Sequence, residues 1–159
     1  MLDMIPAKVK KVLDSNGLEA LEFEPGSTPT VEMAAKRIGV EAARIAKSLL
    51  FKSKDGKYFM VVCPGDKRIS PSALKRAAGS KLSMTDPDET ERVTGFRPGG
   101  VCPFAVSGVE ILIDAELGRF DRVYPAAGTD ATGVPTDIAQ LVKATGGKVV
   151  DFSAQGGLE

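Results

Sequence analysis

Residues 45–63, IAKSLLFKSKDGKYFMVVC, decide the fold because they predict two adjacent β-strands. One apolar run ends at Phe51 and a second extends from Tyr58 to Cys63. The Asp55-Gly56 pair between them favours a tight turn that joins antiparallel strands. The segment therefore predicts a β-hairpin with a strongly apolar second strand.

Lys47 is the unusual residue of this hairpin. Because alternate residues of a strand share a face, Lys47 lies on the same face as Leu49 and Phe51. An ammonium group on an apolar face needs a counter-ion, a ligand or the open end of the sheet. The alternative is that Lys47 precedes the strand proper and extends its ammonium group to solvent.

Residues 94–104, TGFRPGGVCPF, form the second decisive stretch, around which the rest of the chain is organised. Three glycines and two prolines in eleven residues exclude a regular helix or strand and predict a shaped loop. Consecutive N–H groups in such a loop can form a concave donor surface for a carbonyl oxygen or an anion. The alternative is a connector that lines no ligand site.

Composition limits the class of protein. The chain has 159 residues, of which 43% are hydrophobic and 26% charged, as expected for one soluble domain spanning residues 1–159. Lysine plus arginine equals aspartate plus glutamate, 21 each, so bulk charge favours no particular partner. The apolar runs are too short to cross a bilayer and the N-terminus has no signal-peptide pattern, so we expect a cytoplasmic protein.

The absence of histidine removes several kinds of active site. It excludes a Ser-His-Asp triad, a Cys-His pair and a histidine metal site. The two cysteines, Cys63 and Cys102, make neither a disulfide framework nor a zinc-binding spacing. We therefore expect no metal and no cofactor.

The remaining elements are predicted from periodicity and from capping residues. We expect helices at 4–16, 30–38, 71–78, 87–93 and 137–145, and further strands at 18–23, 109–114, 122–126 and 148–152. Short strands mixed with four or five short helices predict a single mixed α/β (α+β) domain.

Basic residues gather in and after the turn that follows the hairpin. They are Lys67, Arg68, Lys75 and Arg76, with Lys81 close behind, and only Asp66 opposes them. This cluster is the best candidate in the chain for contacting nucleic-acid phosphates. The alternative is an ordinary solvated helix face.

Three motifs together resemble the YbaK/prolyl-tRNA-synthetase-associated editing domain family. They are the residues 46–51, the residues 94–103 and the residues 126–129. Each motif is weak alone, but their order and separation are similar to the family's over nearly the whole chain. The resemblance implies a barrel-like mixed sheet flanked by short helices. It also implies a free-standing trans-editing deacylase that hydrolyses the ester joining a wrong amino acid to tRNA.

The resemblance also assigns the site residues. Lys47 matches the family's functional lysine. Gly99, Gly100, Val101, Cys102 and Pro103 match the loop whose backbone lines the aminoacyl pocket, and Gly128 with Thr129 matches a second loop beside it. The implied partners are the 3′ end and acceptor stem of an aminoacyl-tRNA, which the basic cluster would contact, and an aminoacyl-tRNA synthetase.

An aminoacyl ester is already activated, so its hydrolysis needs mainly an oriented water and stabilisation of the oxyanion. Lys47 suits positioning better than proton abstraction, because a lysine side chain is ordinarily charged at neutral pH. Cys102 stands where family members often have serine, threonine or proline, so it tunes the pocket, packs as a small apolar residue or, least favoured, acts as a nucleophile. We expect an alanyl, seryl or threonyl ester, with cysteinyl as the alternative.

Two functions of other classes stay open. One is a non-catalytic module that binds tRNA ends or a synthetase, which would need the basic cluster but no lysine in a pocket. The other is sequence-independent DNA binding, which the zero net charge and the lack of a recognition motif disfavour.

Overall fold

The computed structural model describes residues 5–152, and the predicted hairpin is its central feature. Strands β2 (Ala46–Ser53) and β3 (Tyr58–Pro64) pair antiparallel, with Lys47 opposite Cys63. The Ser53 N–H donates to the carbonyl oxygen of Lys57 across the turn, at 2.9 Å. Gly56 occupies the left-handed region at φ 87°, which explains the glycine there. The hairpin prediction is confirmed.

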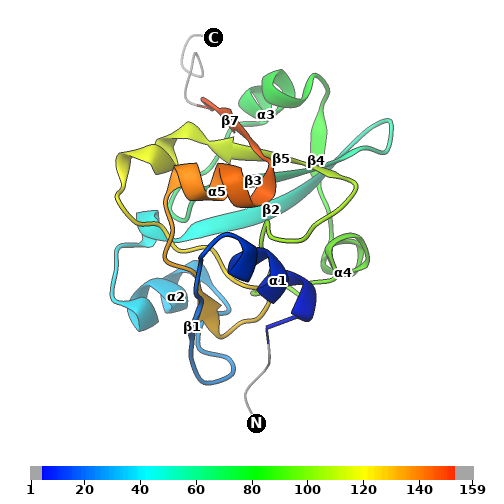
Figure 1. Ribbon diagram of the computed structural model, residues 1–159. Helices are drawn as coiled ribbons and strands as arrows, with labels where there is room; N and C mark the ends of the chain where they lie inside the picture. Colours follow the sequence, from blue (N-terminus) through cyan, green and yellow to red (C-terminus); the bar gives the residue numbers. More distant parts are fainter. Residues whose placement is uncertain (1–4, 153–159) are drawn as a thin grey trace.

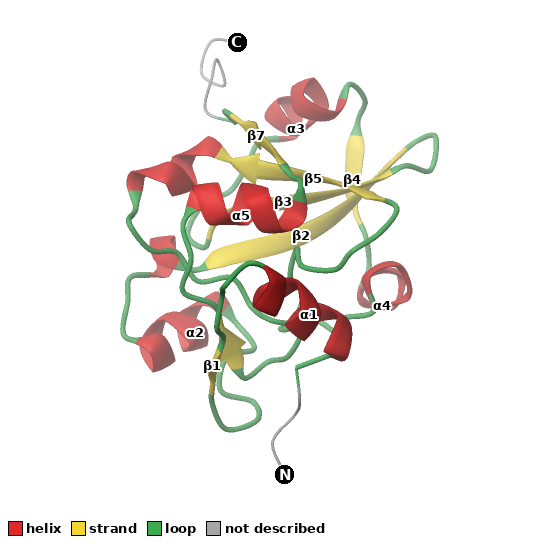
Figure 2. Cartoon of the chain, in the orientation of Figure 1, coloured by secondary structure: helices red, strands yellow, loops and turns green. Residues whose placement is uncertain are grey.

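Three more strands extend the hairpin into a mixed sheet of order β4-β2-β3-β5-β7. Strand β4 (Leu82–Met84) pairs antiparallel with β2, whereas β5 (Val109–Asp114) runs parallel to β3 and β7 (Lys148–Val150) parallel to β5. A separate pair joins β1 (Leu21–Glu22) to β6 (Thr132–Gly133). The mixed α/β class is confirmed, but the barrel-like closure is wrong. Strands β4 and β7 are short and lie at opposite edges of an open sheet, so within residues 5–152 no ladder closes it (Figure 2).

Helices cover both faces of the sheet. Helices α1 (Ala7–Ser15) and α5 (Ile138–Thr145) lie over the near face in Figure 1, and α3 (Pro71–Ala78) lies at the upper end. The core on the α1 and α5 side includes Val9, Leu141, Met60 and Ile113. The core on the α3 side includes Leu74, Phe51, Val61, Leu112 and Phe152. The strands are apolar on both faces because each face is covered.

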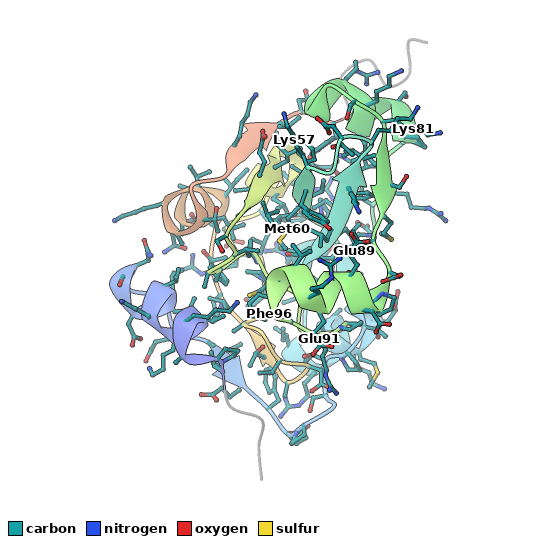
Figure 3. The ribbon with its side chains drawn as sticks, turned by 90° about the vertical axis from the view of Figure 1, so that its right-hand side faces the viewer. Lys57, Met60, Lys81, Glu89, Glu91 and Phe96 are labelled. Atoms are coloured by element: carbon teal, nitrogen blue, oxygen red, sulfur yellow. The ribbon has the colours of Figure 1, made fainter. Side chains whose placement is uncertain are left out.

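Two further helices lie near the part of the β2 edge that β4 leaves unpaired. Helix α2 (Val31–Ile38) begins at Thr30, whose side chain accepts the Met33 N–H, and α4 (Pro87–Thr94) begins at Asp86, whose side chain accepts the Glu89 N–H. Both N-caps agree with the sequence. Figure 3 shows Phe96, which follows α4, between α4 and α1. The Lys8 ammonium lies over its ring and donates to the Thr94 carbonyl oxygen, and so holds the start of the glycine-rich loop.

Several predicted bounds differ from the structure. The strand expected at 18–23 is only two residues long, and the segment 122–126 makes isolated bridges instead of a strand. Strands β4 and β6 and the 3-10 helices η1 (Ala42–Arg44) and η2 (Ala115–Arg119) were not expected. Residue 4, at the start of the first predicted helix, is outside the described residues. Over residues 5–152, no helix has the length and apolar character needed to cross a membrane.

Candidate functional site

A cavity of about 430 Å³ lies beside the part of the β2 edge that β4 leaves unpaired. Four groups of residues form its wall: β2 with Ile45 before it, helix α2 with the segment before it, residues 84–101 around α4, and residues 124–132. The lining residues are Thr28, Pro29, Thr30, Val31, Ala34, Ile38, Ile45, Ala46, Lys47, Ser48, Leu49, Leu50, Met84, Thr85, Pro87, Thr90, Pro98, Gly99, Val101, Tyr124, Ala126 and Thr132. Segments from most of the chain therefore meet at one site.

Lys47 is the only charged residue in the described part of this wall. The other polar groups there are hydroxyls and main-chain amides, and no carboxylate lines the cavity. Since the chain has no histidine, the wall offers no ordinary general base. Residues 5–152 also bring together no group of three potential metal ligands. The chemistry available here is hydrogen bonding and one positive charge.

The Lys47 side chain is half-buried, and its ammonium donates to the main-chain carbonyl oxygen of Lys67 at 2.7 Å. Lys67 lies in the turn after β3, where its N–H donates to the Pro64 carbonyl oxygen. The apolar-face position predicted from alternation is confirmed, because Leu49 and Phe51 pack into the α3-side core. The ammonium is held by a neutral acceptor and keeps two further N–H donors.

A buried ion-pair network anchors that turn. The Lys67 ammonium lies 2.8 Å from Asp114 Oδ2 and 2.9 Å from Glu116 Oε1. Asp114 is almost fully buried, at 1% exposure, and its Oδ1 accepts the Glu116 N–H. Burial acts to lower the pKa of Lys67, but hydrogen bonds to Asp114 and Glu116 outweigh it and raise that pKa above its ordinary value. The Lys67 charge is thus neutralised by two carboxylates of the protein itself. The other basic residues of the cluster, Arg68, Lys75, Arg76 and Lys81, are exposed.

The two predicted loops are in contact. A Cβ on Gly100 would lie 2.9 Å from main-chain atoms of Gly128 and Thr129, closer than real Cβ contacts. Gly99 has φ 93°, and a Cβ there would lie 3.1 Å from Cα of Pro29. Glycine is therefore required at both positions, because the backbones approach each other too closely for a side chain.

The N–H groups of the glycine-rich loop are not equivalent. The Gly100 N–H donates to the Arg97 carbonyl oxygen at 2.9 Å and is used within the turn. The N–H groups of Gly99 and Val101 have no hydrogen-bond partner among residues 5–152, and both residues line the cavity. Gly99 and Val101 are thus the lining residues of this loop whose N–H groups have no partner in the described structure.

Several predicted site residues lie behind the wall instead of in it. Cys102 and Pro103 are buried, and the Cys102 thiol contacts the Phe104 carbonyl oxygen at 3.8 Å. Burial raises the pKa of Cys102 to about 12, so the thiol stays protonated and inert at neutral pH. Gly128 and Thr129 pack against the main chain of Gly100 and do not line the cavity, whereas the nearby Ala126 and Thr132 do.

Sequence reasoning missed the opposite wall. The sequence predicted a helix at 30–38 but gave it no part in the site, whereas Val31, Ala34 and Ile38 of α2 line the cavity. Tyr124 was assigned to a strand, but it bridges to Ile45 at the cavity edge. No local signal identifies these residues, because their role depends on how distant segments meet.

Comparisons with known proteins identify the family of this chain. Residues 25–144 match the model of the aminoacyl-tRNA editing domain, which is most of the chain. The chain belongs to the aminoacyl-tRNA editing domain family. The resemblance inferred from the three motifs is therefore confirmed.

Relatives of this editing domain include free-standing proteins and parts of synthetases. The uncharacterized protein YwhH of Bacillus subtilis (strain 168) is 36% identical over 132 residues, which are 82% of this chain and 83% of the relative. A proline--tRNA ligase of Thermosipho melanesiensis is 35% identical over 105 residues, which are 65% of this chain but only 18% of the ligase. This editing domain thus corresponds to about a fifth of such a ligase.

Solved structures show the same fold. A candidate trans-editing enzyme for prolyl tRNA synthetase superposes with a TM-score of 0.84 at 29% identity, covering 95% of this editing domain and 98% of that chain. The hypothetical protein APE2540 gives the same TM-score at 31% identity, covering 91% and 97%. Both proteins match this editing domain over nearly their whole length.

Proposed function

We propose that this editing domain is a trans-acting aminoacyl-tRNA deacylase for a small mischarged amino acid. The observation that carries the proposal is the cavity beside β2, whose wall contains one lysine and two loop residues with unpaired N–H groups. The family and the trans-editing neighbour support deacylation in general. The substrate and the residue roles given below are our own inferences.

The reaction needs water as its only co-reactant. A water oxygen adds to the ester carbonyl carbon, and the bond from that carbon to the ribose oxygen then breaks. The proton lost by water ends on the ribose oxygen, which releases a free amino acid and uncharged tRNA. No carboxylate or imidazole lines the cavity. We therefore assign the orientation of the water to the neighbouring ribose hydroxyl of the tRNA.

We assign the stabilisation of the negative charge that develops on the carbonyl oxygen to the N–H groups of Gly99 and Val101. Removal of one such donor in other enzymes typically costs about 100-fold to 1,000-fold in rate. Lys47 would bind a phosphate oxygen or a ribose oxygen of the terminal nucleotide with the two N–H donors that Lys67 leaves free. Its role is therefore to position the ester, not to accept a proton.

The substrate side chain is best assigned as small. The cavity must hold both the aminoacyl group and part of the terminal nucleoside within about 430 Å³. We favour alanyl, seryl and threonyl esters, with cysteinyl as the alternative. One methylene changes discrimination by only about 1 to 3 kcal/mol, so a narrow group of substrates is expected instead of a single one.

The proposed partners are an aminoacyl-tRNA and a prolyl-tRNA synthetase, the enzyme in which related domains occur. Arg68, Lys75 and Arg76 are the exposed basic residues that would contact the acceptor stem. They remain the candidates for tRNA binding after the Lys67 side chain is assigned to the internal network.

The test is a deacylation assay on tRNAs charged with alanine, serine, threonine, cysteine and proline. We expect one or two of the first four esters to be hydrolysed well above the spontaneous rate, and prolyl-tRNAPro to be spared. If every ester is stable while tRNA still binds, the protein is a non-catalytic tRNA-binding module and the proposal fails.

A further inference from the structure

The edge of β2 that faces the cavity is unpaired over one stretch. On the other edge, β2 pairs with β3 along its length, and the Ser53 N–H donates across the hairpin. On the cavity edge, the Ala46 N–H donates to the Tyr124 carbonyl oxygen at 3.2 Å, and the Leu50 carbonyl oxygen accepts from the Thr85 N–H at 3.1 Å. Strand β4 begins to pair only at Phe51.

Main-chain polar groups alternate between the two edges of a strand, so Ser48 faces the same edge as Ala46 and Leu50. Its N–H and its carbonyl oxygen therefore point toward the cavity. Within residues 5–152, no hydrogen bond engages either group on that edge. Ser48 is a lining residue and only half-buried, although its hydroxyl oxygen is buried and has no partner in the described chain.

An unpaired strand edge inside a mostly apolar cavity is unusual. Buried main-chain N–H and carbonyl groups are nearly always paired, and an open edge accepts an extended segment as an added strand. The Ala46 N–H and the Leu50 carbonyl oxygen are engaged at the two ends of this stretch, so Ser48 is the residue whose N–H and carbonyl oxygen are both open on this edge. A ligand complementary to Ser48 has one hydrogen-bond donor and one carbonyl oxygen with the spacing of a single amino-acid residue.

We propose that the Ser48 main chain binds the aminoacyl group of the substrate as a one-residue antiparallel strand, an inference that rests on the proposed deacylase function. The substrate α-ammonium donates to the Ser48 carbonyl oxygen, and the ester carbonyl oxygen accepts the Ser48 N–H. Two residues that face each other in this way exchange both hydrogen bonds. A carbonyl oxygen has two lone pairs, so the loop N–H groups of Gly99 or Val101 can bind it as well.

The composition of the wall supports this assignment. The α-ammonium of an amino acid needs oxygen acceptors, and no carboxylate lines the cavity to provide them. A neutral carbonyl oxygen at Ser48 meets that need. It also avoids placing a fixed negative charge beside the oxyanion that develops during hydrolysis.

The pairing also fixes the direction of the substrate side chain. Opposite residues of an antiparallel pair project their side chains to the same face. Ser48 shares a face with Ala46 and Leu50, which belong to the α1- and α5-side core, and Val101 and Ala126 pack against that core while lining the cavity. The substrate side chain is thus placed among Ser48, Val101 and Ala126, where the small side chain proposed above would lie.

The first experiment follows main-chain amides by NMR, using 3′-alanylamido-3′-deoxyadenosine as a stable amide analogue of the substrate end. We expect the Ser48 amide to exchange rapidly in the free protein, and to shift and become protected when the analogue binds. The Leu49 amide, which faces β3, is the internal control and should stay protected throughout. Binding that leaves Ser48 exchange unchanged would overturn the proposal, as would failure to bind at millimolar concentration.

The second experiment is Ser48→Pro, which deletes the N–H without removing a bond of the β2–β3 ladder. Proline is tolerated on a strand edge whose N–H faces outward, so this variant should keep the native pattern of β3 and β5 amides. We expect the rate of ester hydrolysis to fall about tenfold or more. Ala126→Leu should abolish hydrolysis of threonyl esters before that of alanyl esters.

These outcomes separate the two proposals. If the wild-type protein hydrolyses an ester while Ser48→Pro is folded and fully active, the Ser48 assignment fails and the deacylase function stands. If the wild-type protein hydrolyses none of the esters, the function itself fails.

Discussion

The Lys47 ammonium is bound by the main-chain carbonyl oxygen of Lys67, on a turn that the Lys67 side chain anchors to Asp114. The position of the Lys47 ammonium in the cavity wall therefore depends on the turn that the buried Lys67–Asp114 ion pair holds in place. This arrangement makes Lys67 a positioning residue for Lys47, although it lies outside the cavity lining.

The first prediction tests whether Lys67 positions the Lys47 ammonium. Lys67→Met leaves the Asp114 carboxylate buried without its partner, so we expect the free energy of unfolding to fall by about 3 kcal/mol. We also expect kcat for deacylation to fall about tenfold in the wild-type background and not at all when Lys47 is already alanine. Chemical denaturation and a double-mutant cycle measure the two effects.

Lys54→Met is the matched control, because Lys54 is exposed and makes no ion pair in the described structure. It should leave the free energy of unfolding within about 0.5 kcal/mol and kcat within about twofold. Independent losses in the two lysine backgrounds would contradict the proposed connection between Lys47 and Lys67.

The second prediction concerns the contact between the two loops. Gly100→Ala places a Cβ 2.9 Å from main-chain atoms of Gly128, which cannot move as a flexible side chain can. We expect a loss of about 2 kcal/mol in unfolding free energy and a large loss of activity. Gly118→Ala is the control, because its Cβ would meet only Ile138 side-chain atoms at 3.6 Å or more. Equal stability of the two variants would refute the close packing.

The third prediction concerns the thiols. Burial raises the pKa of Cys63 to about 11 and that of Cys102 to about 12, from the ordinary value of 9.0. An unfolded chain loses these protons near pH 9 and the folded chain does not, so the free energy of unfolding should fall as pH rises from about 9 toward 11 and 12. Denaturation between pH 7.5 and 10 measures this slope.

The same burial predicts that iodoacetamide at pH 8 labels neither cysteine in the folded protein and leaves deacylation unchanged. Mass spectrometry of native and unfolded samples checks the labelling. Rapid modification of Cys102 with loss of activity would instead revive the nucleophilic alternative for that residue.

The fourth prediction concerns tRNA binding. Arg68→Ala and Lys75→Ala should each raise KM for an aminoacyl-tRNA without changing kcat, because their exposed charges would contact phosphates outside the cavity. Each should also reduce the slope of log affinity against log salt by about 0.7 to 0.9. Lys54→Ala, at the exposed hairpin turn, is the control. Unchanged KM in both variants would show that tRNA binds elsewhere.

Local signals predicted the scaffold well. The Asp55-Gly56 turn located the β2–β3 hairpin, and Thr30, Ser70 and Asp86 located three helix starts because a cap is decided by neighbouring residues. The alternation rule placed Lys47 on the correct face. The open sheet was not predicted, since closure depends on which strands lie at the edges.

The site was only partly accessible from sequence. Gly99, Val101 and Lys47 were identified and line the cavity, but Cys102 sits one residue further and its side chain turns into the core. Ser48 carried no signal, because its exposed edge results from where β4 stops pairing with β2. Lys67 was predicted to contact phosphates, but its ammonium is paired with Asp114, which lies 47 residues later in the chain. Such pairings are tertiary and leave no mark on local sequence.

The most direct test of the account is single-turnover hydrolysis of the preferred ester by the wild-type protein, Lys47→Ala and Lys52→Ala. Lys52 lies on the same strand but outside the cavity, and its exposed side chain pairs with the half-buried Glu89, so its loss should matter little for the reaction. We predict that Lys47→Ala loses at least about 100-fold in rate while remaining folded, and that Lys52→Ala stays within about twofold of the wild type. A folded Lys47→Ala variant with the wild-type rate would contradict the assignment of the active site to this cavity.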